Sequence, residues 1–424
     1  MPAPATIRQA AILIGGMGTR LGALAADTPK PLLPCGDRPF LAWLMRELSR
    51  FGVRDFVLLA GHLPARVAEL LPGLVATLPI EAQVSVSLEP FPAGTGGAVL
   101  HARQHLDEQF LLCNGDSFLD GNLARLLSGA AAAPPEAVAQ VALRAVPDTS
   151  RYGVVREAGG RITEFRPRPP QDSPAAPGLI NAGLYVVRRD PLMERLEPVC
   201  SLEADVLPRL AAEGRLGGSV LDGYFIDIGV PEDLARARAE LPGRLRRPAL
   251  FLDRDGVLNH DHGWVGTRER FRWTDGALEA LRLATEAGWH AMVVTNQSGV
   301  ARGFYDEAAV RGLLDWMASE VRARGGTLDD ARYCPHHPEA PLAAYRRVCG
   351  CRKPAAGMLR DLIARWELEP SRCLMIGDQP NDMLAAAAAG VAGHLLQPGV
   401  RVDELVRSLL AIETNSPREP RALQ

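Results

Sequence analysis

Two aspartates, Asp253 and Asp255, follow the apolar run ALFL (249–252), with one residue between them. A carboxylate can attack phosphorus to form an acyl phosphate, and a second carboxyl group can protonate the leaving alcohol and later activate water. If the strand continues through the pair, both side chains project from the same face. The spacing therefore predicts a phosphatase site with Asp253 as the nucleophile and Asp255 as the acid and base.

Lysine is scarce in this chain. Of its 47 lysine and arginine residues, only Lys30 and Lys353 are lysines, so we expect these two positions to need a compact ammonium group. Lys30 follows the loop GGMGTRLG (15–22), whose glycines let backbone N–H groups surround phosphate oxygens. Arg20 lies in that loop, so two cations would meet one triphosphate. The loop has neither the GK[ST] of an ATPase P-loop nor the spacing of a dinucleotide-binding fingerprint.

Four potential metal ligands crowd into the segments CPHHP (334–338) and CGC (349–351). Thiolates with one imidazole favour tetrahedral Zn²⁺, and four protein ligands make a closed, structural site. Two buried cysteine pairs are the alternative. Because the second segment runs directly into Lys353, the metal would fix a substrate-facing loop. The predicted ligands are Cys334, His336, Cys349 and Cys351.

Short apolar runs alternate with helix-like stretches in both halves, which predicts two doubly wound α/β domains. At 424 residues the chain is too long for one core, because cores stop growing beyond roughly 250–300 residues. The stretch LPGRLRRP is rich in proline and arginine and lacks apolar periodicity. We therefore expect a first domain at 1–240, a linker at 241–248, a second domain at 249–413 and a disordered tail at 414–424.

The composition excludes several classes of protein. A net charge of −3 provides no basic surface for nucleic acid. No apolar stretch approaches the roughly 20 residues that cross a bilayer, so we expect no membrane partner. The early run AAILIGG is too short and too glycine-bounded for a secretory signal, which favours a cytoplasmic protein. The oligomeric state is not indicated.

Residues 9–240 resemble the sugar-phosphate nucleotidyltransferases. The resemblance rests on GGxGTRL and PKPLLP, supported by EPFPAGTGGAV (89–99), CNGDSF (113–118), INAGLYV (180–186) and YFIDIG (224–229). It implies a Rossmann-like mixed sheet on which a sugar phosphate oxygen attacks the α-phosphorus of a nucleoside triphosphate. Asp116 and Asp227 would then hold Mg²⁺. The implied nucleotide contacts are Gly15, Gly16, Gly18, Thr19, Arg20, Lys30, Gly94, Thr95 and Gly96, with Arg20 and Lys30 on the phosphates; the implied sugar contacts are Gly153 and Asn181.

One stretch departs from that family. FRPRPP (165–170) lacks the Glu-Lys-Pro usual there, so Arg168 replaces the lysine and the carboxylate is missing. The details of sugar recognition therefore do not follow from the resemblance.

The second half resembles the haloacid dehalogenase (HAD) superfamily. Four motifs occur in the expected order: DRDG (253–256), VVTNQSG (293–299), CRKP (351–354) and IGDQPNDM (376–383). The resemblance implies a HAD-like Rossmannoid domain in which Thr295 binds the transferred phosphoryl group and Lys353 neutralises it. Asp378 would join Asp253 and the carbonyl of Asp255 around Mg²⁺.

Within that superfamily, DHGWVG (261–266), NQSGVARGFY (296–305) and CPHHPEA resemble the zinc-containing heptose bisphosphate 7-phosphatases over residues 249 to about 400. This similarity implies that Asn296, Arg302 and Arg352 contact the substrate. Removal of the 7-phosphate of D-glycero-D-manno-heptose 1,7-bisphosphate leaves a 1-phosphate, the kind of acceptor that the first half requires.

The first half is most similar to heptose 1-phosphate guanylyltransferases. Together the resemblances imply a bifunctional enzyme of GDP-heptose synthesis that takes GTP and sugar phosphates. Two alternatives stay open. A mannose 1-phosphate guanylyltransferase, or another sugar-1-phosphate nucleotidyltransferase, joined to a histidinol-phosphatase-like enzyme would carry the same motifs. The first half could instead be a non-catalytic module that binds a sugar nucleotide and regulates the phosphatase.

Overall fold

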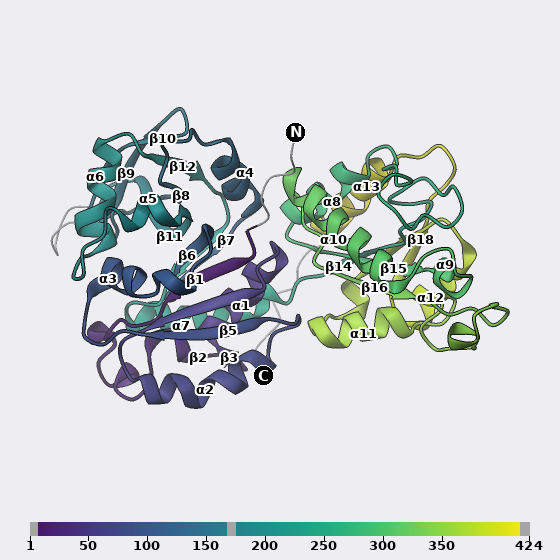
Figure 1. Cartoon of the computed structure of the whole chain (residues 1–424), viewed down its shortest axis with the longest axis horizontal. Helices are drawn as coiled ribbons and strands as arrows, with labels where there is room; N and C mark the ends of the chain where they lie inside the picture. Colours follow the sequence, from purple (N-terminus) through teal and green to yellow (C-terminus); the bar gives the residue numbers. More distant parts are fainter. Residues whose placement is uncertain (1–6, 168–174, 416–424) are drawn as a thin grey trace. The chain divides into compact units, whose positions relative to one another are not determined.

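The computed structural model describes residues 7–167 and 175–415 of the chain. It divides into two compact units, one ending at Leu245 and the other beginning at Arg246 (Figure 1). Each unit has its own sheet and its own hydrophobic core. No helix in the described part of the chain is both long and apolar enough to cross a bilayer.

The first unit is built on a nine-stranded mixed sheet with the order β5-β4-β1-β6-β11-β8-β12-β10-β9. Strands β5, β4, β1 and β6 are parallel, and β11 runs antiparallel to β6. This agrees with the predicted mixed sheet. The strands are β1 (Gln9–Leu13), β4 (Asp55–Ala60), β5 (Gln83–Leu88), β6 (Gln109–Asn114), β8 (Ala139–Val146), β9 (Val154–Ala158), β10 (Arg161–Arg166), β11 (Gly178–Arg188) and β12 (Leu216–Val220).

Helices cover this sheet because its central strands are apolar on both faces. Helix α1 is buried along its whole length, and the indole N–H of Trp43 donates to the carbonyl of Cys35 at 2.8 Å. The helices are α1 (Phe40–Arg50), α2 (Pro64–Ala76), α3 (Gly94–His101), α4 (Ala124–Ala132), α5 (Arg189–Met193), α6 (Leu207–Ala212) and α7 (Pro231–Leu245).

Two small antiparallel pairs complete the first unit. Strand β2 (Pro34–Cys35) pairs with β3 (Arg38–Pro39), and β7 (Ser117–Asp120) pairs with β13 (Tyr224–Asp227). The second pair sets Asp227 opposite Ser117, the residue after Asp116. Two aspartates more than a hundred positions apart are thereby brought to one place.

The second unit is a five-stranded parallel sheet with the order β16-β15-β14-β17-β18. Its central strand β14 is buried throughout, as a parallel strand covered on both faces should be. The strands are β14 (Ala249–Leu252), β15 (His290–Asn296), β16 (Asp330–Cys334), β17 (Leu374–Gly377) and β18 (Ala392–Leu395). The helices are α8 (Ala277–Glu286), α9 (Ser298–Ala301), α10 (Glu307–Ala323), α11 (Gly357–Trp366), α12 (Pro380–Ala388) and α13 (Val402–Asn415).

The structure corrects the predicted linker at 241–248. Helix α7 continues to Leu245, and its buried side chains Leu234, Ala237, Leu241 and Leu245 follow a helical period that the Pro- and Arg-rich composition concealed. Only 246–248 remain between the last helix of one unit and the first strand of the next. The predicted tail at 414–424 lies outside the described residues, except for Thr414 and Asn415, which end α13.

Candidate active sites

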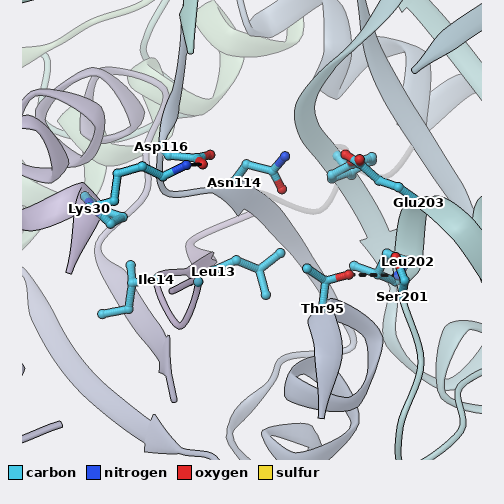
Figure 2. A pocket seen from close by; sticks show the side chains of 12 residues that line it. Leu13, Ile14, Lys30, Thr95, Asn114, Asp116, Ser201, Leu202 and Glu203 are labelled. Carbon is cyan, nitrogen blue, oxygen red and sulfur yellow. Dashed lines mark hydrogen bonds and ion pairs between the residues drawn. The ribbon is translucent and has the colours of Figure 1, made fainter. Parts of the chain in front are cut away.

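A pocket of about 180 Å³ opens in the first unit where β1 and β6 end (Figure 2). The carboxyl edge of parallel strands is the usual ligand side of such sheets. Figure 2 shows Lys30 and Asp116 together on one side of this pocket and Glu203 on the other. Its lining consists of Leu13, Ile14, Gly16, Lys30, Pro31, Thr95, Asn114, Asp116, Tyr185, Ser201, Leu202 and Glu203.

The ammonium group of Lys30 forms an ion pair with the Asp116 carboxylate, and the Lys30 side chain is only 11% exposed. The hydroxyl of Ser117 donates weakly to both aspartates, at 3.4 Å to Asp116 and 3.3 Å to Asp227. Burial raises the pKa of Asp227, and the Asp116 charge adds to this, while Lys30 and Arg20 oppose it. Two carboxylates and two cations therefore share one site, an arrangement that fits a divalent cation bound with phosphates.

Glu203 faces this cluster from the opposite wall of the pocket. Burial raises the pKa of its carboxyl group, opposed by a hydrogen bond with Asn114, while the charges of Asp116 and Asp227 raise it further. The side-chain amide of Asn181 donates to Glu203 Oε1 at 2.9 Å. A carboxyl group held in this way can accept hydrogen bonds from sugar hydroxyls.

The predicted nucleotide contacts are only partly gathered at this pocket. Gly16, Lys30 and Thr95 line it, and Arg20 lies beside Asp227. Thr95 accepts a hydrogen bond from the Leu202 amide at 2.8 Å. The other predicted contacts lie in the glycine-rich loop or at the start of α3 without lining the pocket; they are Gly15, Gly18, Thr19, Gly94 and Gly96.

Two of these glycines are required by the local backbone structure. The Gly96 amide donates to the Cys200 carbonyl at 2.9 Å, and a Cβ at Gly96 would collide with the Cys200 sulfur. Gly18 adopts a left-handed conformation with φ of 61° at the turn before residues 19–25.

The predicted sugar contacts Gly153 and Asn181 lie together, because the backbone amide of Asn181 donates to the Gly153 carbonyl at 3.3 Å. Arg168 lies outside the described residues.

In the second unit, Lys353 is buried among acceptors. Its Nζ lies 2.9 Å from Asp253 Oδ1, 2.7 Å from Asp382 Oδ1 and 2.9 Å from the carbonyl of Val294, and its side chain is 2% exposed. Burial raises the pKa of Asp253 to about 7, although the Lys353 charge pulls it down. Burial also lowers the pKa of Lys353, but the two aspartates outweigh this and raise it overall. The lysine therefore stays charged.

A cluster of three carboxylates surrounds this lysine. Ligand oxygens of Asp253, Asp378 and Asp382 all lie within 4.8 Å of one another. Oδ1 of Asp378 is buried and has no hydrogen-bond partner among the residues that the structure describes. Gly256, with φ of 84°, brings its backbone against Asp378, where a Cβ would collide with the carboxylate. Oxygen ligands and an unsatisfied buried oxygen fit a hard cation such as Mg²⁺.

The strand argument for Asp253 and Asp255 is wrong. Strand β14 ends at Leu252, so both aspartates lie in the turn beyond it. The Asp255 carboxylate is outside the three-carboxylate cluster and accepts hydrogen bonds from Arg254, Asn259 and Gln297 instead. What the turn provides is a fixed, separate position for the second carboxyl group.

Of the remaining predicted residues of the second site, two end strand β15 and two lie outside it, Arg302 just after α9 and Arg352 on the loop before Lys353. Thr295, in β15, is buried, and its hydroxyl accepts from Gln297 Nε2 at 2.8 Å. Asn296 exchanges two hydrogen bonds with the backbone of Lys353, each 3.1 Å long, so its amide is committed to holding the lysine loop. Arg302 is exposed above the Trp264 ring, and Arg352 donates to the His336 carbonyl.

The cysteine and histidine ligands converge beside this loop. Sγ of Cys351 lies 3.3 Å from Cys334 Sγ, 3.2 Å from Cys349 Sγ and 3.5 Å from His336 Nδ1, and all three thiols are free. Ligands on a tetrahedron with Zn–S bonds of about 2.3 Å would be separated by roughly 3.7 Å. The group can therefore hold a metal ion after small outward shifts, and the alternative of two cysteine pairs is not formed.

Comparison with known proteins identifies both units. The family described as nucleotidyl transferase matches residues 9–243, and the family described as HAD-hydrolase-like matches residues 350–416. This chain belongs to the nucleotidyl transferase family.

The second unit of this nucleotidyl transferase is related to curated phosphatases. It is 47% identical over 165 residues to D-glycero-beta-D-manno-heptose-1,7-bisphosphate 7-phosphatase of Rhodopseudomonas palustris, covering 39% of this chain and 91% of the relative. The Salmonella typhi protein of the same name is 44% identical over 149 residues, covering 35% of this chain and 79% of the relative. The second unit belongs to this phosphatase family, and the chain is a fused transferase and phosphomonoesterase.

Solved structures resemble each unit separately. HddC from Yersinia pseudotuberculosis is 27% identical and covers 55% of this chain and 100% of its own, with a TM-score of 0.48. A D,D-heptose 1.7-bisphosphate phosphatase from B. bronchiseptica, complexed with magnesium and phosphate, is 32% identical. It covers 39% of this chain and 99% of its own, with a TM-score of 0.35.

Sequence reasoning missed several residues at the two sites of the nucleotidyl transferase–phosphatase. Asp382 stands four residues after Asp378 inside IGDQPNDM and caps α12 together with Gln379, so its place in a known motif was the available signal. Glu203 offered no such signal, because its segment SLEADVL reads as an ordinary helix start. Asn114 and Tyr185 lie inside segments that were recognised, but as parts of strands.

The buried cation in the phosphatase unit leads to a stability prediction. We expect Lys353→Met to lower the free energy of unfolding of this unit by about 3–5 kcal/mol without added Mg²⁺, because Asp253 and Asp382 would remain buried without a cation. Denaturant unfolding followed by circular dichroism measures the change.

Arg311→Met is the matched control, because Arg311 is 60% exposed and pairs with Glu307 at the surface of the same unit. An exposed pair of this kind contributes about 0–1 kcal/mol. Equal losses in the two variants would contradict the view that Lys353 holds a buried acidic cluster together.

Proposed function

We propose that this enzyme makes GDP-heptose in the cytoplasm in two consecutive steps. The phosphatase unit removes the 7-phosphate of D-glycero-D-manno-heptose 1,7-bisphosphate, and the transferase unit moves GMP from GTP to the resulting 1-phosphate, with release of pyrophosphate. The observation that carries the proposal is the pair of separate sites, each with a buried lysine against aspartates, in a chain whose phosphatase relatives are named for the heptose bisphosphate. The choice of GTP rests on the sequence resemblance of the first half to guanylyltransferases.

In the phosphatase unit, an oxygen of Asp253 attacks the 7-phosphorus as the bond to the sugar oxygen breaks. Asp255 gives its proton to the leaving oxygen, and then takes a proton from the water that hydrolyses the aspartyl phosphate. Lys353 holds Asp253 at 2.9 Å and offsets the phosphoryl charge, while Thr295 donates its hydroxyl to a phosphoryl oxygen. Mg²⁺, held by Asp253, Asp378 and the carbonyl of Asp255, would supply charge neutralisation for the transferred group.

In the transferase unit, the chain's task is to bring two anions together in line and to neutralise their charge. Lys30 and Arg20 lie beside the acidic pair Asp116 and Asp227, where they can also contact the triphosphate. The aspartates would provide the oxygen ligands for a second Mg²⁺. Across the pocket, Glu203, which accepts a hydrogen bond from Asn181, is placed to accept hydrogen bonds from the sugar.

The two activities have a chemical order. The transferase needs a sugar with a free phosphate at carbon 1 and a neutral far end, which is the product of the phosphatase. We therefore expect the bisphosphate to be a poor acceptor and the monophosphate a good one.

The proposal is tested by offering heptose 1,7-bisphosphate with GTP, ATP, CTP or UTP in turn and following phosphorus by NMR. We expect inorganic phosphate first, and then a diphosphate doublet with GTP only. Phosphate release with no sugar nucleotide from any triphosphate would favour a non-catalytic first unit. If another nucleoside triphosphate or another sugar phosphate gives a product, that sugar nucleotide would replace GDP-heptose in the proposal.

Variants of the two acidic sites should separate the activities. Asp253→Asn should lower the rate of phosphate release by about 10³-fold or more and leave transfer to heptose 1-phosphate unchanged, because the amide cannot attack phosphorus. Asp116→Ala should do the reverse. Both rates are measured on the full chain with purified substrates.

Asp361→Asn and Asp190→Ala serve as controls, since each removes a surface carboxylate paired with an arginine in the same unit as its matched variant. Loss of both activities in either active-site variant would refute two independent sites.

The thiol cluster should hold one structural Zn²⁺ per chain. Cys351→Ala is expected to release the metal and to lower the unfolding temperature of the phosphatase unit by on the order of 10 °C, because metal binding contributes directly to folding. Elemental analysis and calorimetry measure the two effects. Cys373→Ala removes a buried thiol outside the cluster and should retain the zinc. An unmodified enzyme without zinc would end this proposal.

A further inference from the structure

The proposed acid and base of the phosphatase, Asp255, is held in place by side chains from three directions. Arg254 Nη2 donates to both carboxylate oxygens, at 2.8 and 2.9 Å, and Asn259 Nδ2 donates to Oδ1 at 3.0 Å. A further contact comes from Gln297 Nε2, which lies 2.8 Å from Oδ2. Arg254 and Asn259 are near in sequence, but Gln297 comes from the loop after β15.

Gln297 can donate a hydrogen bond to Asp255 in only one orientation of its side-chain amide. The side chain is 1% exposed, and its Nε2 donates to Thr295 Oγ1 as well as to Asp255. If the amide were flipped, its oxygen would face the carboxylate oxygen and repel it. The orientation is set at the other end, where the hydroxyl of Tyr305 donates to Gln297 Oε1 at 2.8 Å.

Two glycines leave room for the Tyr305 ring. A Cβ at either Gly266 or Gly299 would overlap the ring, so glycines from two separate segments, Gly299 from α9, make room for it. Burial raises the pKa of Tyr305 to about 12, and the hydroxyl therefore keeps the proton that it donates. The neighbouring segments are also joined by a tilted contact between the rings of Trp264 and Phe304, whose centroids lie 4.4 Å apart.

We propose that Tyr305, acting through the amide of Gln297, is a positioning residue that holds the carboxyl group of Asp255 against the leaving-group oxygen of the phosphate ester. The proposal rests on the phosphatase activity and on the role given to Asp255 above. In the first step, the phosphorus–oxygen bond to the alcohol breaks and the Asp255 proton moves to that oxygen. Misplacing the carboxyl group slows this step most when the leaving oxygen is strongly basic.

The leaving group therefore separates this role from a general structural one. An alkoxide from a sugar needs the proton, whereas p-nitrophenolate is a weak base and leaves without it. Tyr305→Phe keeps the ring and removes only the hydroxyl. We expect kcat for heptose 1,7-bisphosphate to fall by about 10-fold or more with KM changed by less than about 2-fold, and kcat for p-nitrophenyl phosphate to stay within about 2-fold.

Two further variants test this interpretation, one that should reproduce the effect and one that serves as a control. Gly299→Ala displaces the Tyr305 ring and should produce the same selective loss on the alkyl ester. Tyr333→Phe removes a hydroxyl that donates to Glu307 at 2.7 Å, away from Asp255, and should leave both substrates unaffected.

Equal losses on both substrates with Tyr305→Phe would overturn the proposal, because Gln297 would then act through Thr295 on phosphoryl binding. Unchanged rates on both would overturn it as well. If the unmodified enzyme does not cleave the heptose bisphosphate, the proposed substrate fails. The inference is then decided with glycerol 2-phosphate as the alkyl ester and the same aryl ester for comparison.

Discussion

The pairing of an ammonium group with several buried carboxylates is the interaction on which both halves of this enzyme depend. Carboxylates gathered out of water repel one another and lose their hydration, so a group of them is tolerated only when cations share the site. Lys30 does this for Asp116 and Asp227, and Lys353 does it for Asp253 and Asp382. A site that already balances acidic side chains with fixed cations is also prepared to receive a phosphate together with a metal ion.

Sheet topology decides which carboxylates meet. In the phosphatase unit, Asp253 follows the central strand β14 and Asp378 follows its neighbour β17, so parallel pairing alone brings them to one edge. In the transferase unit the partners come from distant parts of the chain. The short pair β7 and β13 aligns Asp227 with Ser117, and the Ile228 amide donates to the Asp116 carbonyl at 2.9 Å.

Much of this arrangement could be predicted from the sequence, because motifs and apolar alternation are local. The two doubly wound units followed from the alternation of apolar runs with helical stretches, the mixed sheet of the first unit from the family resemblance, and the aspartates of the phosphatase from their motifs. Glu203 could not be found, because only the folded chain places residues 201–203 in the wall of the pocket across from Asp116 (Figure 2). The turn after Leu252 was missed for a related reason. Periodicity shows that a strand exists but not at which residue it ends.

The placement of the lysines also determines where reagents that modify amines can react with this protein. Because the chain has only these two lysines and both are largely buried against aspartates, its surface carries no ε-amino group. Reagents that require a lysine amine would find their side-chain targets only at these two sites. The positive charge of the remaining surface is supplied by arginine, which carries no ε-amino group.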